Sequence, residues 1–163
     1  MSIFHQLKIS EVVRETEEAI SVSFDVPETL SKDYEYIQGQ HLTLKTDVDG
    51  EEVRRSYSIC SAVGDGQLKV AIKQIEGGLF STYANQNLTP GQSMDVMVPQ
   101  GRFYTPLSAD NKKHYLFVAA GSGITPIFSI LKTVLQTESE SRVTLIYGNK
   151  TVSSILFLEQ LED

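Results

Sequence analysis

The chain has 163 residues, with 21 Asp or Glu against 14 Lys or Arg, so its formal charge is −7. That charge excludes a nucleic-acid binder that relies on phosphate neutralisation, and 40% hydrophobic residues exclude a disordered chain. The single cysteine excludes a disulfide framework and a self-contained iron–sulfur site, which needs about four thiolates. No apolar run approaches the roughly 18 residues of a membrane span, and the start lacks a signal peptide's apolar core, so we expect a cytoplasmic protein without a membrane segment.

The first 106 residues are expected to form short β-strands. Apolar and polar residues alternate with period two, as in half-buried strands, in four segments at 20–26, 41–45, 67–73 and 94–98. Turn residues precede the last two of these segments, at 64–66 and 90–91. Short strands separated by glycine and proline predict an antiparallel barrel or sandwich.

The period changes after an expected linker at residues 105–111. The continuous apolar runs 115–120 and 143–147 are typical of strands buried on both faces. Between them, apolar residues recur at helical spacing, with Thr125 as the expected N-cap and Pro126 at the first helical position.

Residues 153–161 are expected to form the beginning of a second helix, which completes a β-α-β-α order. That order predicts the opening of a parallel, doubly wound sheet. Such a domain usually needs about five strands, and two strands would leave apolar faces uncovered. We therefore expect either a fragment of a longer protein or a second chain that supplies the missing layer, and the uncovered face predicts self-association.

The segment Arg54-Arg55-Ser56-Tyr57-Ser58 is a basic island after an acidic stretch. On a strand, Arg55 and Tyr57 would share one face, with Ser56 and Ser58 on the other. A guanidinium can hold a phosphate through two hydrogen bonds, and a tyrosine ring can lie against a flat heterocycle. The spacing alone also fits a solvated strand with an ordinary tyrosine contact.

Two glycine motifs are candidate anion sites. Gly77 and Gly78 precede a short helical pattern, whose free N–H groups could hold an anion, although a plain turn with Ser81 as N-cap fits too. The segment 121–123 lies between a strand and a helix, where dinucleotide-binding proteins place a phosphate loop. Pro126 stands where G-x-G-x-x-G has its third glycine, so a tight strand-to-helix turn is the alternative.

Together these motifs are far more specific than each is alone. The order of Arg55-Ser56-Tyr57-Ser58, Glu76–Ser81 and Gly121–Pro126 resembles the ferredoxin–NADP reductase superfamily. The stretches 38–44, 98–101 and 146–149 look most like the branch that supplies the flavin reductase component of phenylacetyl-CoA epoxidase in phenylacetate degradation. The resemblance covers essentially the whole chain. It implies an antiparallel FAD-binding β-barrel at 1–106 and the truncated N-terminal part of a doubly wound NAD(P)-binding domain at 107–163.

The resemblance also implies roles for the matching residues. Arg55 would bind the flavin pyrophosphate, Tyr57 would stack on the isoalloxazine ring and Ser58 would lie near its reactive edge. The other implied flavin contacts are Ser56, Ile72, Lys73, Gly78, Phe80, Ser81 and Thr125. The implied contacts of the nicotinamide cofactor are Gly121, Ser122, Pro126, Tyr147, Gly148 and Asn149. Tyr57, Ser58 and Thr125 are the expected catalytic residues.

The implied activity is electron transfer from NAD(P)H through FAD to a [2Fe–2S] centre that serves an oxygenase. The protein's main task would be to align two rings, so no proton-transfer dyad is expected and the three histidines are interpreted as structural. The iron–sulfur domain and a Cys-Gly stretch that helps to place nicotinamide would follow Asp163. We therefore expect the chain to bind flavin but to show impaired NAD(P)H-dependent turnover.

Two other hypotheses stay open: a flavin-binding or regulatory module without turnover, and a barrel without any cofactor. The choice between NADH and NADPH is open as well, because Lys150 fits both a contact to a 2′-phosphate and an ordinary surface position.

Overall fold

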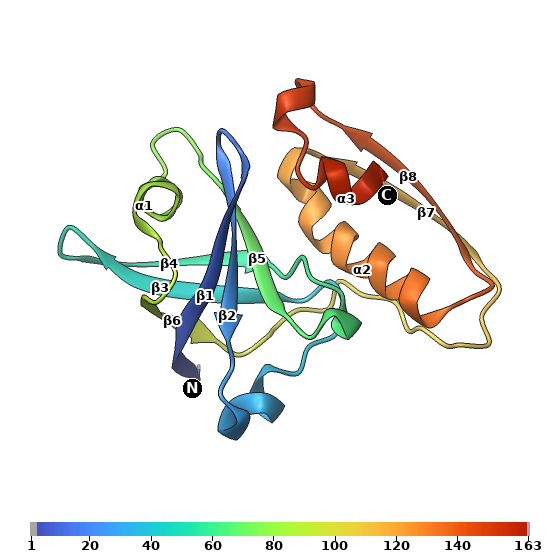
Figure 1. Ribbon diagram of the computed structural model, residues 1–163, viewed down its shortest axis with the longest axis horizontal. Coiled ribbons are helices and arrows are strands. Elements are labelled where there is room, and N and C mark those ends of the chain that lie inside the picture. Colours follow the sequence, from blue (N-terminus) through green and yellow to red (C-terminus); the bar gives the residue numbers. More distant parts are fainter. Residues whose placement is uncertain (1–2, 163) are drawn as a thin grey trace.

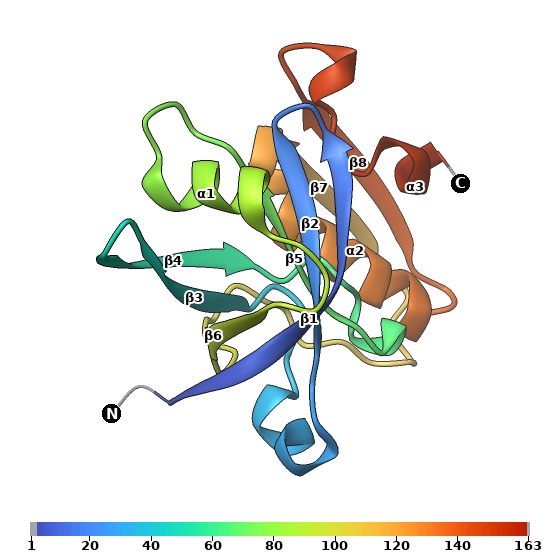
Figure 2. The same ribbon diagram turned by 60° about the vertical axis from the view of Figure 1, so that its left-hand side comes forward.

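The computed structural model describes residues 3–162, and within them six antiparallel strands form one curled sheet (Figures 1 and 2). Along the sheet the strands follow the order β4-β3-β6-β1-β2-β5. Their bounds are β1 Phe4–Thr16, β2 Ala19–Asp25, β3 His41–Val48, β4 Glu51–Ser58, β5 Leu68–Lys73 and β6 Ser93–Met97. The four strands predicted from alternation are confirmed, and β1 is an addition that no sequence pattern indicated.

The long strand β1 curls the sheet into a half-barrel. Its first residues, from Phe4 to Lys8, pair with β6, whereas the part from Lys8 onward pairs with β2. Register shifts at Ile9/Glu11 and Arg14/Thr16 bend it, because a bulge adds local twist. Helix α1 (Leu79–Asn87) contacts β3, β4 and β5 and buries Phe80 and Ala84 against the barrel core. A 3-10 turn, η1 (Glu28–Tyr34), buries Tyr34 in the same core.

Strand β2 is not half-buried as predicted, because residues 19–24 are all buried. Ile20, Val22 and Phe24 belong to the barrel core, whereas Ala19 belongs to a second apolar cluster that includes residues of helix α2. The alternation was recognised correctly, but the outer face of the strand is covered by the C-terminal part of the chain.

That C-terminal part is a small parallel α/β unit. Strands β7 (His114–Ala120) and β8 (Arg142–Gly148) pair in parallel, with helix α2 (Ile124–Thr137) between them in sequence. Figure 1 shows α2 between the barrel and this two-stranded sheet. No helix within residues 3–162 is both long and apolar enough to cross a membrane.

The two strands of this unit are not buried on both faces as predicted. One face packs against the second apolar cluster, which includes residues of α2. The residues on that face are Phe117, Ala119, Val143, Leu145 and Tyr147. The opposite face is open, with Leu116 64%, Val118 67% and Ile146 57% exposed. The expectation of an uncovered apolar face is therefore confirmed for this chain.

Two helix-start predictions in this unit are wrong. Gly121 has a φ of 50° and begins a 3-10 turn, η3 (Gly121–Gly123), so Gly123 takes the N-cap position of α2. Thr125 is instead the second residue of the helix, with its hydroxyl donating to Ser122 O at 3.0 Å, and Pro126 is the third.

The last helix, α3, covers only Leu158–Glu162 instead of beginning at residue 153. The residues before it form a 3-10 turn, η4 (Val152–Ser154). Ser154 donates its hydroxyl to Thr151 O at 2.8 Å and accepts the Thr151 N–H at 3.3 Å. Such local side-chain bonds stabilise a turn in place of a helix.

Candidate functional site

A cleft of about 720 Å³ lies where the half-barrel meets the start of α2. The barrel wall includes Ser56, Tyr57 and Ser58 of β4 and Ala71 and Lys73 of β5, together with residues 74–76 and Glu18. The opposite wall consists of Ser122, Gly123, Thr125, Pro126 and Lys150. The cleft thus brings together predicted site residues from segments up to about 70 positions apart.

The register of β4 puts Arg55 and Tyr57 on one face, as predicted. They lie opposite Leu44 and Leu42 of β3, which are fully buried, and residues directly opposite in a sheet share a face. Ser56 lies on the other face, where its hydroxyl is 2.9 Å from that of Thr43. Arg55 extends from the core-facing side of the strand, yet its side chain is exposed.

Arg55 and Tyr57 differ sharply in charge and burial. Arg55 donates one hydrogen bond to Arg54 O at 2.7 Å, and among residues 3–162 it forms no salt bridge. Tyr57 is half-buried, and its ring lies 5.7 Å from that of Phe80, the second residue of α1. Burial raises the pKa of Tyr57 to about 12, so its hydroxyl is neutral at physiological pH. The pair combines a free positive charge with a flat neutral ring.

The start of α1 is closely fitted around Gly78. A Cβ added there would lie 2.5 Å from Ser81 Oγ and 3.0 Å from Ile75 O. Ser81 is the third residue of the helix and not its N-cap; its hydroxyl accepts the Ile75 N–H at 3.1 Å. Gly78 is the N-cap and no side chain caps this end, so the backbone N–H groups of the first turn are available to an anion.

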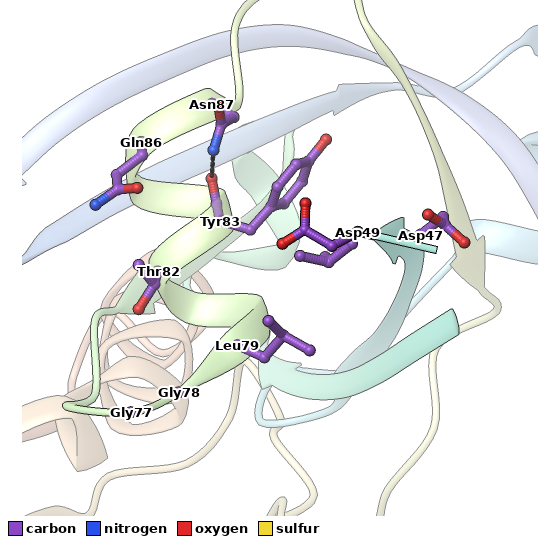
Figure 3. A pocket seen from close by; sticks show the side chains of 10 residues that line it. Asp47, Asp49, Gly77, Gly78, Leu79, Thr82, Tyr83, Gln86 and Asn87 are labelled. Carbon is purple, nitrogen blue, oxygen red and sulfur yellow. Dashed lines mark hydrogen bonds between the residues drawn. The ribbon is translucent and has the colours of Figure 1, made fainter. Parts of the chain in front are cut away.

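A second pocket of about 450 Å³ extends from Gly77 and Gly78 to the turn between β3 and β4 (Figure 3). Figure 3 shows Tyr83 and Leu79 pointing from α1 toward this turn, where Asp49 lies beside the tyrosine ring. The sequence indicated Gly77 and Gly78 as a candidate anion site, but not the part of this pocket formed by Tyr83 and the turn between β3 and β4. The local signal for that part is the turn Asp47–Gly50, in which Asp47 accepts the Gly50 N–H at 2.8 Å.

A third space, about 580 Å³ in volume, lies at the ends of β7 and β8 and adjoins the main cleft. The two share Lys73, Ser122 and Lys150. Gly121, Gly148 and Asn149 also line this space. The side-chain amide of Asn149 is buried, yet neither its Oδ1 nor its Nδ2 has a hydrogen-bond partner within the described chain. A buried amide without partners is costly and is often satisfied by a ligand or water.

Several predicted site residues lie behind these surfaces. Ile72 and Phe80 belong to the barrel core, and the Ile72 carbonyl accepts the Asn85 side chain at 3.1 Å. Tyr147 lines neither cleft, because its hydroxyl donates to Gly121 O at 3.0 Å and accepts the Leu156 N–H at 3.3 Å.

Asn85 is a positioning residue that the sequence reasoning missed. It is buried on α1, and Arg14 of β1 donates to its Oδ1 at 2.9 Å and to its carbonyl at 2.7 Å. Because Asn85 also bonds Ile72, it fixes α1 to both β1 and β5. The partners are 71 and 13 positions apart, so no local pattern could reveal them.

Neither the main cleft nor the third space is lined by a histidine. His5 contacts Tyr34, His114 bonds Thr144 at 2.7 Å, and His41 lies beside Gly101. Within residues 3–162, no group of three His, Cys, Asp or Glu side chains is placed to hold a metal ion. The main cleft and the third space are lined by one aromatic ring, hydroxyls, glycines and lysines, together with the carboxylates of Glu18 and Glu76.

Comparison with known proteins assigns this arrangement to a family. Residues 6–105 match the family described as the oxidoreductase FAD-binding domain. The chain belongs to this family. Residues 117–163 match the oxidoreductase NAD-binding domain, so the FAD-binding barrel is followed by part of an NAD-binding domain.

Two curated relatives in this family are longer than the chain. It is 49% identical over 163 residues to a subunit of 1,2-phenylacetyl-CoA epoxidase from Escherichia coli K12, a match that covers 100% of this chain and 46% of the relative. It is 40% identical over 157 residues to the ferredoxin reductase component of 3-ketosteroid-9-alpha-monooxygenase from Rhodococcus rhodochrous, a match that covers 95% and 44%. The chain thus spans less than half the length of these relatives.

Solved structures share the fold. A ferredoxin-NADP+ reductase from Plasmodium falciparum superposes with a TM-score of 0.81 at 23% identity, covering 98% of this chain and 67% of that one. Phthalate dioxygenase reductase superposes with a TM-score of 0.80 at 24% identity, covering 98% and 48%. The chain therefore shares the half-barrel followed by a parallel α/β part with these two reductases.

Proposed function

We propose that the chain is the FAD-binding part of an NAD(P)H-dependent oxidoreductase that passes electrons through the flavin to a [2Fe–2S] centre serving an oxygenase. Residues 1–106 are the FAD-binding domain and 107–163 the first part of the NAD(P)-binding domain. The observation that carries this proposal is the main cleft, which gathers β4, β5 and the start of α2 in a chain of the FAD-binding family. Phenylacetate or related aromatic degradation is the proposed setting, supported by the identity to the phenylacetyl-CoA epoxidase relative.

The residues fit FAD at its pyrophosphate. Arg55 would offer a guanidinium that forms no salt bridge among residues 3–162, and the uncapped start of α1 at Gly78 would offer backbone N–H groups to the pyrophosphate. Ser81 holds the turn before this helix through its bond to Ile75, and Phe80 joins the turn to the ring of Tyr57. An added Cβ at Gly78 would strike Ser81 and the backbone, so the close approach requires glycine there.

The residues also fit the two halves of FAD on either side of the pyrophosphate. Tyr57 would supply a flat, neutral surface for the isoalloxazine ring, and Ser58 and Thr125 would approach that ring from the two opposite walls of the cleft. Ser56, Ile72 and Lys73 would add backbone contacts along β4 and β5. The pocket beside Gly78 has room for the adenosine half, which FMN lacks.

Bound there, FAD would accept a hydride from a nicotinamide and release electrons singly to an iron–sulfur acceptor. The chain's own work is alignment and exclusion of water, since misplacement by about 1 Å can cost 100-fold in rate. Tyr57, Ser58 and Thr125 surround the site of that transfer and are the proposed catalytic residues.

The nicotinamide cofactor would use the third space. Gly121, Ser122 and Pro126 would line its path, and Gly148 and Asn149 would receive its nucleotide end. The unpartnered amide of Asn149 supports this placement. Tyr147 would act only indirectly, by holding Gly121 through its hydroxyl.

The proposed partners are an iron–sulfur domain or ferredoxin-like acceptor and an oxygenase component. Phthalate dioxygenase reductase is described as a modular structure for electron transfer from pyridine nucleotides to [2Fe-2S], which supports the same direction of transfer here. The exposed face of β7 and β8 would mediate self-association of the isolated chain. The proposed location of the protein is the cytoplasm, where NAD(P)H is available.

The test begins with the visible spectrum of the purified chain and identification of any released flavin. Bound FAD that NADH or NADPH bleaches under anaerobic conditions would support the proposal. Bound FAD that neither nucleotide reduces would favour a flavin-binding module without turnover. A colourless protein that takes up no added FAD would refute both.

A further inference from the structure

A polar stripe on helix α2 is hydrogen-bonded to the barrel loop at residues 61–65. The stripe consists of Ser129, Lys132, Thr133 and Gln136, and it lies outside both clefts. Ser129, which is fully buried, donates its hydroxyl to Ser61 O at 2.7 Å. Thr133, 5% exposed, accepts the Val63 N–H at 3.2 Å.

Asp65 is the hub of the same contact. Its carboxylate accepts hydrogen bonds from Lys132 Nζ at 2.7 Å, from Gln136 Nε2 at 2.8 Å and from Ala62 N at 2.9 Å. Burial alone would raise the pKa of Asp65, but the bond from Lys132 is the main cause that holds it below its usual value. A Cβ on Gly64 would lie 2.7 Å from Gln136 Oε1, so the loop fits closely against the helix.

The stripe and the loop connect directly to opposite walls of the main cleft. Thr125 lies one helical turn before Ser129, on the same face of α2 and about 6 Å away along the axis. Ser58 lies three residues before Ser61 on the barrel side. The hydrogen bond between Ser129 and Ser61 therefore joins the wall that carries Thr125 to the wall that carries Ser58.

The other contact between helix and barrel is apolar and lacks direction. On the barrel side it consists of Ala19, Cys60 and Ala71, which are small and buried with residues of α2. Apolar burial favours contact but not one register, whereas hydrogen bonds are restricted in distance and angle. The stripe supplies the contact that can fix how far α2 slides or rotates on the barrel.

We propose that the polar stripe sets the spacing between the two walls of the cleft, so that its members are positioning residues for hydride transfer. The inference rests on the proposed function, because it concerns how the bound flavin is aligned. It predicts that loosening the stripe disturbs alignment at the ring while leaving the pyrophosphate contacts at Arg55 and Gly78 intact.

The test compares Thr133→Val with Thr133→Ser. The valine removes both the acceptor for the Val63 N–H and the donor to Ser129 O at 2.7 Å within α2, and the serine keeps both. Thr137→Val is the matched control, because Thr137 is exposed on the same helix and shows no side-chain hydrogen bond in the described structure. Gln136→Ala serves as a second variant, since this exposed residue can be changed without a buried cavity.

Cys60 provides a readout that does not depend on activity. It is the only cysteine, and it is 2% exposed between the barrel and α2. We expect Thr133→Val to raise the rate of Cys60 modification by a thiol reagent about fivefold, the factor that corresponds to one ordinary hydrogen bond. Gln136→Ala should raise it about threefold, and Thr133→Ser and Thr137→Val should match the unmodified chain.

The flavin provides the second readout. Thr133→Val should change the visible circular dichroism of bound FAD and lower the rate constant of its reduction at saturating NAD(P)H about tenfold, while the dissociation constant of FAD stays within twofold. Thr133→Ser should keep the dichroism of bound FAD and its reduction rate constant at the values of the unmodified chain. A parallel loss of FAD affinity and thermal stability without this split would mean a merely structural role and would overturn the inference, as would unchanged dichroism and labelling.

Failure of the proposed function is distinguishable from failure of the inference. If the unmodified chain binds FAD but NAD(P)H does not reduce it, the proposed turnover fails, and the dichroism and Cys60 labelling still decide the role of the stripe. If the unmodified chain binds no FAD, the proposed function fails and the inference fails with it.

Discussion

Replacing Gly78 by alanine should disturb the flavin site through one defined clash. The added Cβ would lie 2.5 Å from Ser81 Oγ, 3.0 Å from Ile75 O and 3.3 Å from Ile75 Cβ. The hydroxyl of Ser81 must move, which breaks its 3.1 Å bond with the Ile75 N–H. The start of α1 would shift away from the position in which its N–H groups can meet the pyrophosphate.

The magnitude follows from two costs. Overpacking a tight site costs about 1–3 kcal/mol, and the lost hydrogen bond adds about 1 kcal/mol. We therefore expect Gly78→Ala to lower the free energy of unfolding by about 2–4 kcal/mol and to weaken FAD binding at least tenfold. Denaturant unfolding of the flavin-free chain measures the first effect, and quenching of FAD fluorescence on binding measures the second.

Two further variants make the reasoning refutable. Gly123→Ala is the control, because a Cβ there meets nothing within 4 Å and the residue has a φ of −62°. It should leave the free energy of unfolding nearly unchanged. Ser81→Ala removes the atom that the new Cβ strikes, so Gly78→Ala combined with Ser81→Ala should cost less than the sum of the two. The proposed clash would be refuted if the losses in free energy of unfolding for Gly78→Ala and Ser81→Ala were additive. Equal losses in free energy of unfolding for Gly78→Ala and Gly123→Ala would refute it as well.

Three other changes test separate parts of the site. Arg55→Gln should weaken FAD binding about 10- to 100-fold with little effect on stability. Arg54→Gln, which loses an exposed pair with Glu52 and a contact with the Phe4 ring, should change FAD binding less than about threefold; equal effects in a binding titration would contradict the role of Arg55. Tyr83→Ala and Asp49→Asn should weaken the binding of FAD severalfold but not that of FMN, and parallel losses for both flavins would remove the adenosine half from that pocket. Burial acts to raise the pKa of Glu138, but hydrogen bonds from Ser141 and other donors lower it to about 2. Glu138 should therefore contribute stability that is present above about pH 4.5 and lost as the pH falls toward 2. Glu138→Gln should flatten the pH dependence of the free energy of unfolding in that range, and an unchanged slope would contradict this.

The periodic features of the chain were predictable because they depend on neighbouring residues. Alternation placed the four strands, and the same rule put Arg55 and Tyr57 on one face of β4. Helical spacing located α2 between two strands. The helix starts were not predictable in the same way, because the turn Gly121–Gly123 and the bonds of Ser154 shift the boundaries by a few residues.

Burial was the property that sequence patterns described least well. The alternation in β2 predicted one solvated face, but α2 covers it. The apolar runs of β7 and β8 predicted two covered faces, but one is open within the described chain. A pattern states which side chains favour burial, whereas the neighbouring elements decide whether burial occurs.

The amino-acid sequence alone was sufficient for the strand and helix periods, the pairing of Arg55 with Tyr57 on one face, and the resemblance that indicated a flavin enzyme. The tertiary structure alone decided the sheet order, the link from Arg14 to Asn85, the pocket beside Tyr83 and the polar stripe on α2. The physical reason is separation along the chain. Side-chain direction repeats over two to four residues, but Arg14 and Asn85 are 71 positions apart, Ser61 and Ser129 are 68 apart, and such partners meet only when the chain folds.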